Sequence, residues 1–85
     1  MRKSLYTPEQ EKLLLWLKNK RIEENLNMRD FAKKLHKPHS FVGKVELGER
    51  RLDIIEFVKY CNALGIDPHE GINIVQDSLF KSNKD

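Results

Sequence analysis

The stretch that decides the fold is Phe31-Ala32-Lys33-Lys34-Leu35-His36-Lys37-Pro38-His39-Ser40-Phe41-Val42-Gly43-Lys44-Val45. Its first part continues a stripe of apolar residues at helical spacing that starts at Met28 and ends at Leu35. Pro38 disfavours helical geometry at the residue before it and suits the first turn of a new helix. The sequence therefore predicts a helix over 28–35, a short break, and a second helix over 38–47.

Two short helices joined by about three residues are typical of a helix-turn-helix, in which the second helix can lie in the major groove of DNA. Ala32 lies in the middle of the first helix, where only a small side chain lets the second helix cross closely. Val42 and Val45 lie where the second helix must turn apolar side chains back onto the first. All three residues fit this geometry.

Start signals outside this stretch predict three more helices, over 8–24, 54–64 and 68–80. Their capping residues and first helical positions are Thr7-Pro8, Asp53-Ile54 and Asp67-Pro68. Because no segment shows the two-residue alternation of a strand, we expect an all-α, five-helix architecture. We expect residues 1–85 to form a single domain with its core over about 7–80, and residues 81–85 to fray.

The apolar stripes predict which side chains face the core. The expected inner residues are Leu13, Leu14, Leu17, Phe41, Val42, Val45, Ile54, Phe57, Val58, Cys61, Leu64, Ile72, Val75 and Leu79. Leu15 and Ile22 lie on the far side of the first helix, which is therefore apolar on two sides.

Composition excludes several classes of protein. The longest apolar run, Leu13–Leu17, is far shorter than the roughly 20 residues that cross a bilayer. Met1-Arg2-Lys3 is basic, but no apolar stretch of signal-peptide length follows, so we expect a cytoplasmic protein. The single cysteine, Cys61, rules out an internal disulfide scaffold and a cysteine-rich zinc site, and we expect it to be a packed thiol.

The net charge of +3 is unevenly distributed along the chain. Residues 29–51 carry seven Lys or Arg against three Asp or Glu, whereas residues 52–85 carry three against six. The basic middle segment therefore suits a surface that faces a polyanion.

The chain resembles the phage repressor/Cro-like, XRE-type helix-turn-helix regulators, a lambda-repressor-like DNA-binding fold. The matching residues are Leu26–Leu35, Ser40–Asp53 and Ala63–Asp67, which contain the motif's alanine, a Glu-x-Gly and a Leu-Gly. The resemblance covers roughly residues 9–75. It implies a sequence-specific transcriptional regulator, in most cases a repressor that binds double-stranded DNA as a homodimer at a near-palindromic operator, in a bacterium or phage.

Two positions depart from the family pattern. His36 stands where the turn usually has glycine, and histidine enters the left-handed region more readily than most residues. Met28 stands where the family often has a glutamine that binds phosphate, so this contact is not carried over.

The resemblance also assigns the interface. The positions that reach base edges are His39, Ser40, Gly43 and Lys44, and those that flank them and touch phosphates are Arg29, Lys37, Arg50 and Arg51. Arg51 has alternative partners in Asp53 and Glu46, and Gly43 could instead serve a close helix crossing. Arg21 and Glu46 match a pair that forms a structural salt bridge in the family.

No constellation for metal binding or catalysis can be built from these residues, so we expect no enzyme, no metal, no cofactor and no small-molecule effector. The alternative to a repressor is a protein-interaction module with the same fold, such as an antitoxin or adaptor, using Leu15, Ile22 and Ile74. The same three residues could equally form the homodimer contact of a repressor. A restriction–modification controller protein is a further possibility within the DNA-binding class.

Overall fold

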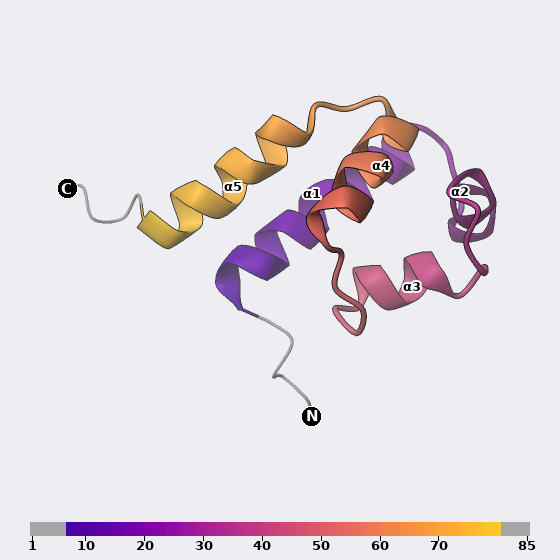
Figure 1. Ribbon diagram of the computed structural model, residues 1–85, viewed down its shortest axis with the longest axis horizontal. Helices are drawn as coiled ribbons and strands as arrows, with labels where there is room; N and C mark the ends of the chain where they lie inside the picture. The colour runs from indigo at the N-terminus through magenta and orange to yellow at the C-terminus, as the bar shows by residue number, and fades with distance from the viewer. Residues whose placement is uncertain (1–6, 81–85) are drawn as a thin grey trace.

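The helices follow one another in the order that the start signals predict. The structure, a computed structural model, describes residues 7–80, and all of the regular structure within that range is helical (Figure 1). The helices are α1 (Pro8–Glu23), α2 (Met28–Lys34), α3 (Phe41–Glu46), α4 (Ile54–Leu64) and α5 (Pro68–Phe80). The all-α fold is therefore confirmed, whereas the expectations for residues 1–3 and 81–85 lie outside the described residues.

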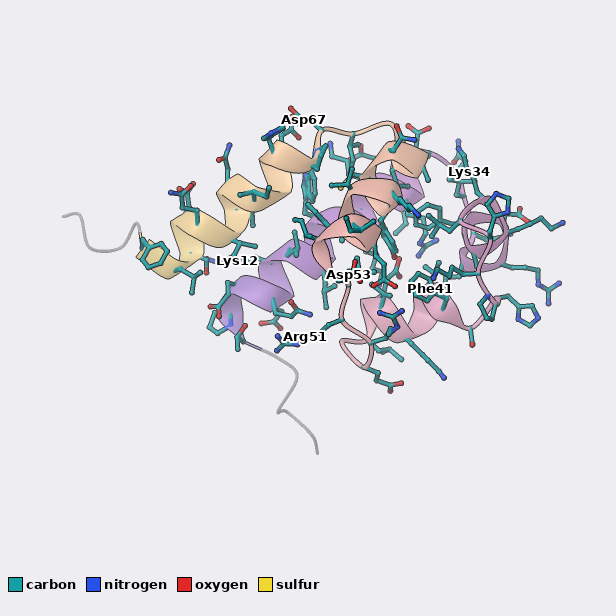
Figure 2. The ribbon with its side chains drawn as sticks, in the orientation of Figure 1. Lys12, Lys34, Phe41, Arg51, Asp53 and Asp67 are labelled. Atoms are coloured by element: carbon teal, nitrogen blue, oxygen red, sulfur yellow. The ribbon has the colours of Figure 1, made fainter. Side chains whose placement is uncertain are left out.

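Side-chain caps explain where the helices begin. Thr7, Asn27 and Asp53 each accept a hydrogen bond from the backbone N–H three residues later, at 3.2, 2.8 and 2.7 Å. Asp67 instead accepts from the backbone N–H of His69 at 2.9 Å, which lowers the pKa of its carboxyl. Figure 2 shows Asp53 and Asp67 at the first turns of α4 and α5.

The turn between α2 and α3 depends on one left-handed residue. His36 has φ +60°, which lies in the left-handed region that we expect a residue at this position to adopt. The backbone N–H of Lys37 donates to the carbonyl of Ala32 at 2.9 Å and closes the turn. The predicted start of α3 at Pro38 was wrong. The N–H of Phe41 bonds to the Pro38 carbonyl across three residues, so the chain forms a tight turn before the α-helix begins at Phe41.

The core lies where α1, α2, α3 and α4 meet. Its fully buried side chains include Leu17, Phe31, Val42, Val45 and Tyr60. The rings of Phe31 and Tyr60 pack edge to face with centroids 4.8 Å apart. This core supports the back of α3, whose three expected inner residues are all buried.

The predicted inner face of α4 was partly wrong. Ile54 and Val58 are exposed, and Tyr60 is buried in their place. The buried stripe consists of Phe57, Tyr60, Cys61 and Leu64, which follow the i, i+3, i+4, i+7 spacing of one helix face. Relative to the prediction, α4 is rotated about its axis so that Tyr60 faces the core. The Tyr60 ring packs there against Phe31 of α2 and Phe41 of α3.

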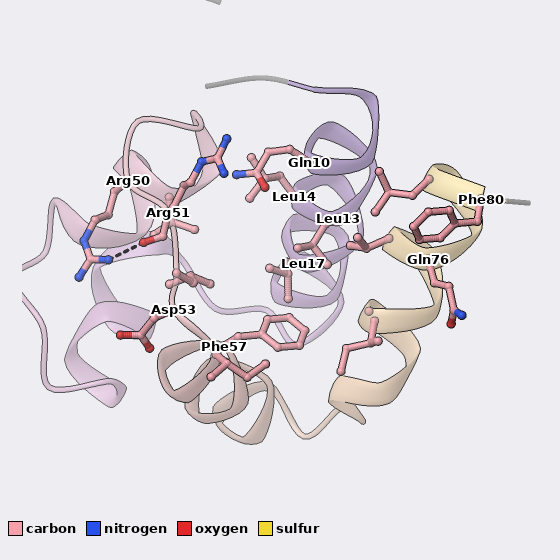
Figure 3. Close-up of a pocket in the computed structure, with 17 residues that line it drawn as sticks. Gln10, Leu13, Leu14, Leu17, Arg50, Arg51, Asp53, Phe57, Gln76 and Phe80 are labelled. Carbon is pink, nitrogen blue, oxygen red and sulfur yellow. Dashed lines mark hydrogen bonds between the residues drawn. The ribbon is translucent and has the colours of Figure 1, made fainter. Parts of the chain in front are cut away.

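Helix α5 lies along α1 and leaves an apolar groove of about 500 Å³ (Figure 3). Gly71 of α5 is buried against Trp16 of α1, since a Cβ at Gly71 would lie 2.6 Å from the Trp16 ring. Ile72 and Leu79 were predicted to face the core, but both remain about half exposed along the groove. Gly71 is therefore the one buried residue of α5 among those described, and the predicted inner residue Val75 is only partly buried.

Candidate nucleic-acid interface

Helix α3 has a buried face and an open face. Phe41, Val42 and Val45 face the core, while His39, Ser40 and Lys44 are exposed. No hydrogen bond or ion pair engages the side chains of these three exposed residues within residues 7–80. The open face therefore presents polar and cationic groups that are available to an external partner.

Gly43 lies on the same open side and touches α2. A Cβ built at Gly43 would lie 3.6 Å from Sδ of Met28, an ordinary van der Waals distance. The crossing of α2 and α3 therefore does not require glycine at this position. A helix-interior glycine costs about 1 kcal/mol relative to alanine, so its presence calls for another reason.

A buried ion pair fixes α3 against α1. Nε of Arg21 donates to Oε2 of Glu46 at 2.7 Å, and Nη2 donates to Oε1 at 3.1 Å. The remaining Nη1 donates to the carbonyl of Leu26 at 2.7 Å. The structure thus joins the two residues that were expected to pair, and the fork geometry sets the orientation of α3.

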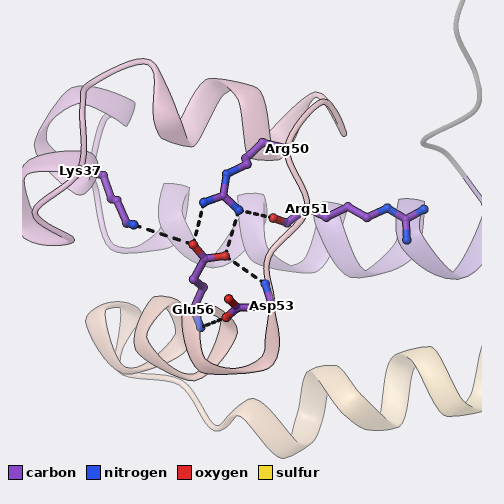
Figure 4. Close-up of polar contacts among 5 residues, drawn as sticks. All are labelled: Lys37, Arg50, Arg51, Asp53 and Glu56. Atoms are coloured by element: carbon purple, nitrogen blue, oxygen red, sulfur yellow. Dashed lines mark hydrogen bonds and ion pairs between the residues drawn. The ribbon is translucent and has the colours of Figure 1, made fainter.

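A second, partly exposed cluster gathers two expected phosphate contacts around Glu56 (Figure 4). Nη1 and Nη2 of Arg50 donate to Oε1 and Oε2 of Glu56 at 2.9 and 2.7 Å. Nζ of Lys37 lies 3.8 Å from Oε2, and both cations lie 5.2 Å from the centroid of the Phe41 ring. We call Lys37, Arg50 and Glu56 the Glu56 cluster.

Hydrogen bonds set the charges of the Glu56 cluster. The bonds from Arg50, helped by the backbone N–H of Asp53, lower the pKa of Glu56 to about 2. The same bonds raise the pKa of Arg50 above its ordinary value. Arg50 and Glu56 are therefore both charged at neutral pH, and the carboxylate offsets part of the positive charge beside α3.

Arg29 and Arg51 differ from the cations of the cluster. Both are exposed, and neither side chain forms an ion pair within the described part of the chain. Of the two alternative partners that the sequence offers Arg51, Glu46 pairs with Arg21, and Asp53 forms no ion pair with Arg51. The Arg51 side chain lines the apolar groove. Among the described residues, two of the four expected phosphate contacts, Arg29 and Arg51, are thus unpaired. The other two, Lys37 and Arg50, are paired with Glu56.

Two further observations concern metal binding and the reactivity of the thiol. Within residues 7–80, no group of three or more His, Cys, Asp or Glu is arranged to hold a metal ion. Cys61 is buried as expected, and burial raises the pKa of its thiol to about 11. No helix in the same range combines the length and apolar character that a membrane span needs.

The sequence did not reveal the role of Glu56. The Asp53–Glu56 spacing predicts the capping box, which the structure contains, but nothing in the spacing joins Glu56 to Arg50 or Lys37. The only signal is an acidic residue six positions after an arginine, which becomes a contact through the loop that precedes α4.

Comparisons with known proteins agree with this geometry. A family model described as helix-turn-helix matches residues 17–70. An XRE-family like protein from Pseudomonas syringae pv. tomato str. DC3000 is 34% identical, with a TM-score of 0.75, over 82% of this chain and 85% of the other. No curated protein sequence gives a significant match.

Two further solved structures share the fold at lower identity. The clp gene regulator ClgR from Corynebacterium glutamicum is 18% identical with a TM-score of 0.72, over 87% of this chain and 96% of its own. A point mutant of the restriction–modification controller protein C.Esp1396I is 19% identical with a TM-score of 0.71, over 88% and 95% of the two chains.

Proposed function

Because the chain belongs to the XRE-type helix-turn-helix family, we propose that it is a DNA-binding transcriptional regulator whose α3 enters the major groove. The observation that carries this proposal is the open face of α3. Its polar side chains have no partner within the described residues, while a packed core and the Arg21–Glu46 pair hold the helix from behind.

Each residue of the open face has a chemistry suited to base edges. Lys44 can donate to O6 and N7 of guanine. Ser40 and His39 can each donate or accept, so they suit more than one base. Gly43 lets the helix backbone approach the bases closely, which supplies the reason for glycine that the packing against Met28 does not.

Phosphate contacts would come from the flanking cations. Arg29 and Arg51 are exposed and unpaired among the described residues, so they can meet a phosphate without giving up a partner. Lys37 and Arg50 share the Glu56 carboxylate and would contribute a partly compensated charge. Such contacts fix the position of the protein on the duplex, whereas the open face of α3 selects the sequence.

We propose that the regulator acts as a homodimer on a near-palindromic operator, most simply as a repressor that occupies a promoter and blocks polymerase. Two copies of α3 would enter successive major grooves about 34 Å apart. A helix this short reads only a few base pairs, so a second copy supplies the discrimination that one half-site lacks.

Selection of bound duplexes from a random pool tests the proposal directly. We expect one enriched half-site that occurs twice with a centre-to-centre spacing of about ten base pairs. The affinity for the selected site should fall steeply between about 50 and 200 mM salt, because bound cations release counterions from the DNA. A pool that shows no enrichment, together with affinity that does not change with salt, would contradict the proposal.

A second candidate function is a protein-interaction module, and the exposed side of α1 favours it. Leu15 and Ile22 are 58% and 52% exposed on that side. A partner protein that covered them would be recovered in a fixed ratio with the chain. Recovery of such a partner with no duplex enrichment would favour this function over DNA binding.

A further inference from the structure

Leu47 lies on the open face of α3 beside the residues expected to read bases. It is the C-cap residue, and its backbone keeps right-handed helical geometry with φ −85° and ψ −2°. The helical rotation of about 100° per residue therefore continues through it and places its side chain between the directions of Gly43 and Ser40. This direction is opposite to the buried face of α3.

Leu47 is about as exposed as Leu15, Ile54 and Ile55 on other helices, and it differs from these three in lying at the end of α3. It is 61% exposed, whereas Val45, two residues earlier on the same helix, is 1% exposed. Its neighbours on the open face are polar, cationic or glycine. An apolar group in that setting gains free energy only when a partner surface covers it.

The major groove offers one apolar feature to such a side chain. Most groups on the base edges there are hydrogen-bond donors or acceptors, and the exception is the C5-methyl group of thymine. We propose that Leu47 is a specificity-determining residue that packs on a thymine methyl in each half-site. The proposal rests on the proposed function, because it requires α3 to lie in the major groove.

The position of that thymine follows from the helix. Leu47 lies three residues after Lys44, which is about 4.5 Å along the helix axis. One base-pair step is about 3.4 Å. The thymine should therefore lie one or two base pairs from the base that Lys44 contacts, and the half-site should require a methyl group there.

Replacing thymine with uracil tests the contact, since it removes only the methyl group. In the selected operator, each thymine is replaced in turn and the affinity of the wild-type chain is compared with that of Leu47→Ala. We expect one thymine position in each half-site to be sensitive. A single uracil at that position should weaken wild-type binding about fourfold, the value for burying one methyl-sized group. The same replacement should leave Leu47→Ala binding unchanged, which makes the two changes non-additive.

Leu15→Ala is the matched control, because Leu15 is exposed to a similar extent on α1. This variant should keep the full uracil effect, and thermal unfolding of both variants verifies that they fold. Uracil effects that are equal in wild-type and Leu47→Ala, or an operator without thymine near the Lys44 base, would overturn the inference while leaving the proposed function intact. A wild-type chain that selects no duplex would overturn both.

Discussion

The two arginine–glutamate pairs of this protein have the same chemistry and different surroundings. Arg21–Glu46 and Arg50–Glu56 are both two-pronged, with their shortest contacts at 2.7 Å. The side chains of the first pair are 9% and 6% exposed, whereas those of the second are 41% and 19% exposed. Burial, more than contact geometry, thus separates a pair that fixes a helix from a pair that tunes surface charge.

The two pairs also differ in what they connect. Arg21 and Glu46 lie 25 residues apart and join α1 to α3, so the pair determines how α3 is presented. Arg50 and Glu56 lie six residues apart and stay within the loop and first turn of α4. The first pair should therefore control whether α3 is positioned at all, and the second should control the charge beside it.

The largest expected effect comes from breaking the buried pair. Arg21→Met leaves the Glu46 carboxylate buried without its partner, which costs about 3–5 kcal/mol of unfolding free energy. Urea unfolding measures this loss, which is a large share of the stability of a domain of this size.

The double variant Arg21→Met/Glu46→Leu is the control, because it removes both charges. It should recover much of the loss, since a buried pair replaced by apolar groups is often neutral. A cost below about 1 kcal/mol for Arg21→Met would instead place the pair with ordinary surface salt bridges.

A smaller effect of opposite sign is expected at Tyr60. Its hydroxyl is buried and has no hydrogen-bond partner within the described residues, and burial raises its pKa. Tyr60→Phe removes this unsatisfied group and keeps the ring that packs on Phe31, so the unfolding free energy should stay equal or rise by about 1 kcal/mol. A clear loss of stability would mean that the hydroxyl has a partner, such as an ordered water molecule.

The partly exposed Arg50–Glu56 pair should give the smallest effect on stability, and this effect should depend on pH. The pKa of Glu56 is about 2 in the folded chain, against about 4.3 for an ordinary glutamate. Folding is therefore favoured by its charged form above about pH 5, and this contribution is lost as the pH falls toward 2. Glu56→Gln, which retains an oxygen for the capping box, should reduce the acid-induced drop in melting temperature over this range.

The salt dependence of Glu56→Gln provides a control. At neutral pH the melting temperature of the variant should lie below that of the wild type, by less than that of Arg21→Met does. Added salt should narrow the difference, because the Arg50–Glu56 pair is partly exposed. An acid melting profile identical to that of the wild type would show that Glu56 does not keep its low pKa in solution.

Local features of the fold were predictable from the sequence. The caps at Thr7, Asn27 and Asp53 depend on residues three apart, so spacing alone predicts them. The family resemblance, and not the spacing, identified His36 as the turn residue, and its φ of +60° lies in the left-handed region.

Features that depend on packing between distant segments were not predictable. Ile54 and Val58 fit an apolar stripe as well as Tyr60 does, and only contact with α2 and α3 decides between them. The Glu56 cluster likewise forms because the loop after α3 returns Arg50 to the start of α4, where it meets Lys37. The resemblance, and not the spacing, suggested the Arg21–Glu46 pair.

If the open face of α3 reads bases, Lys44→Ala should change which base pairs the protein prefers. The measurement is the affinity for the selected operator relative to its single-base variants at matched salt, with Lys12→Ala on α1 as a control that removes the same charge. We expect Lys44→Ala to lose about 1–3 kcal/mol of discrimination at one base pair per half-site, while Lys12→Ala retains it. Full discrimination by Lys44→Ala would show that Lys44 does not read a base.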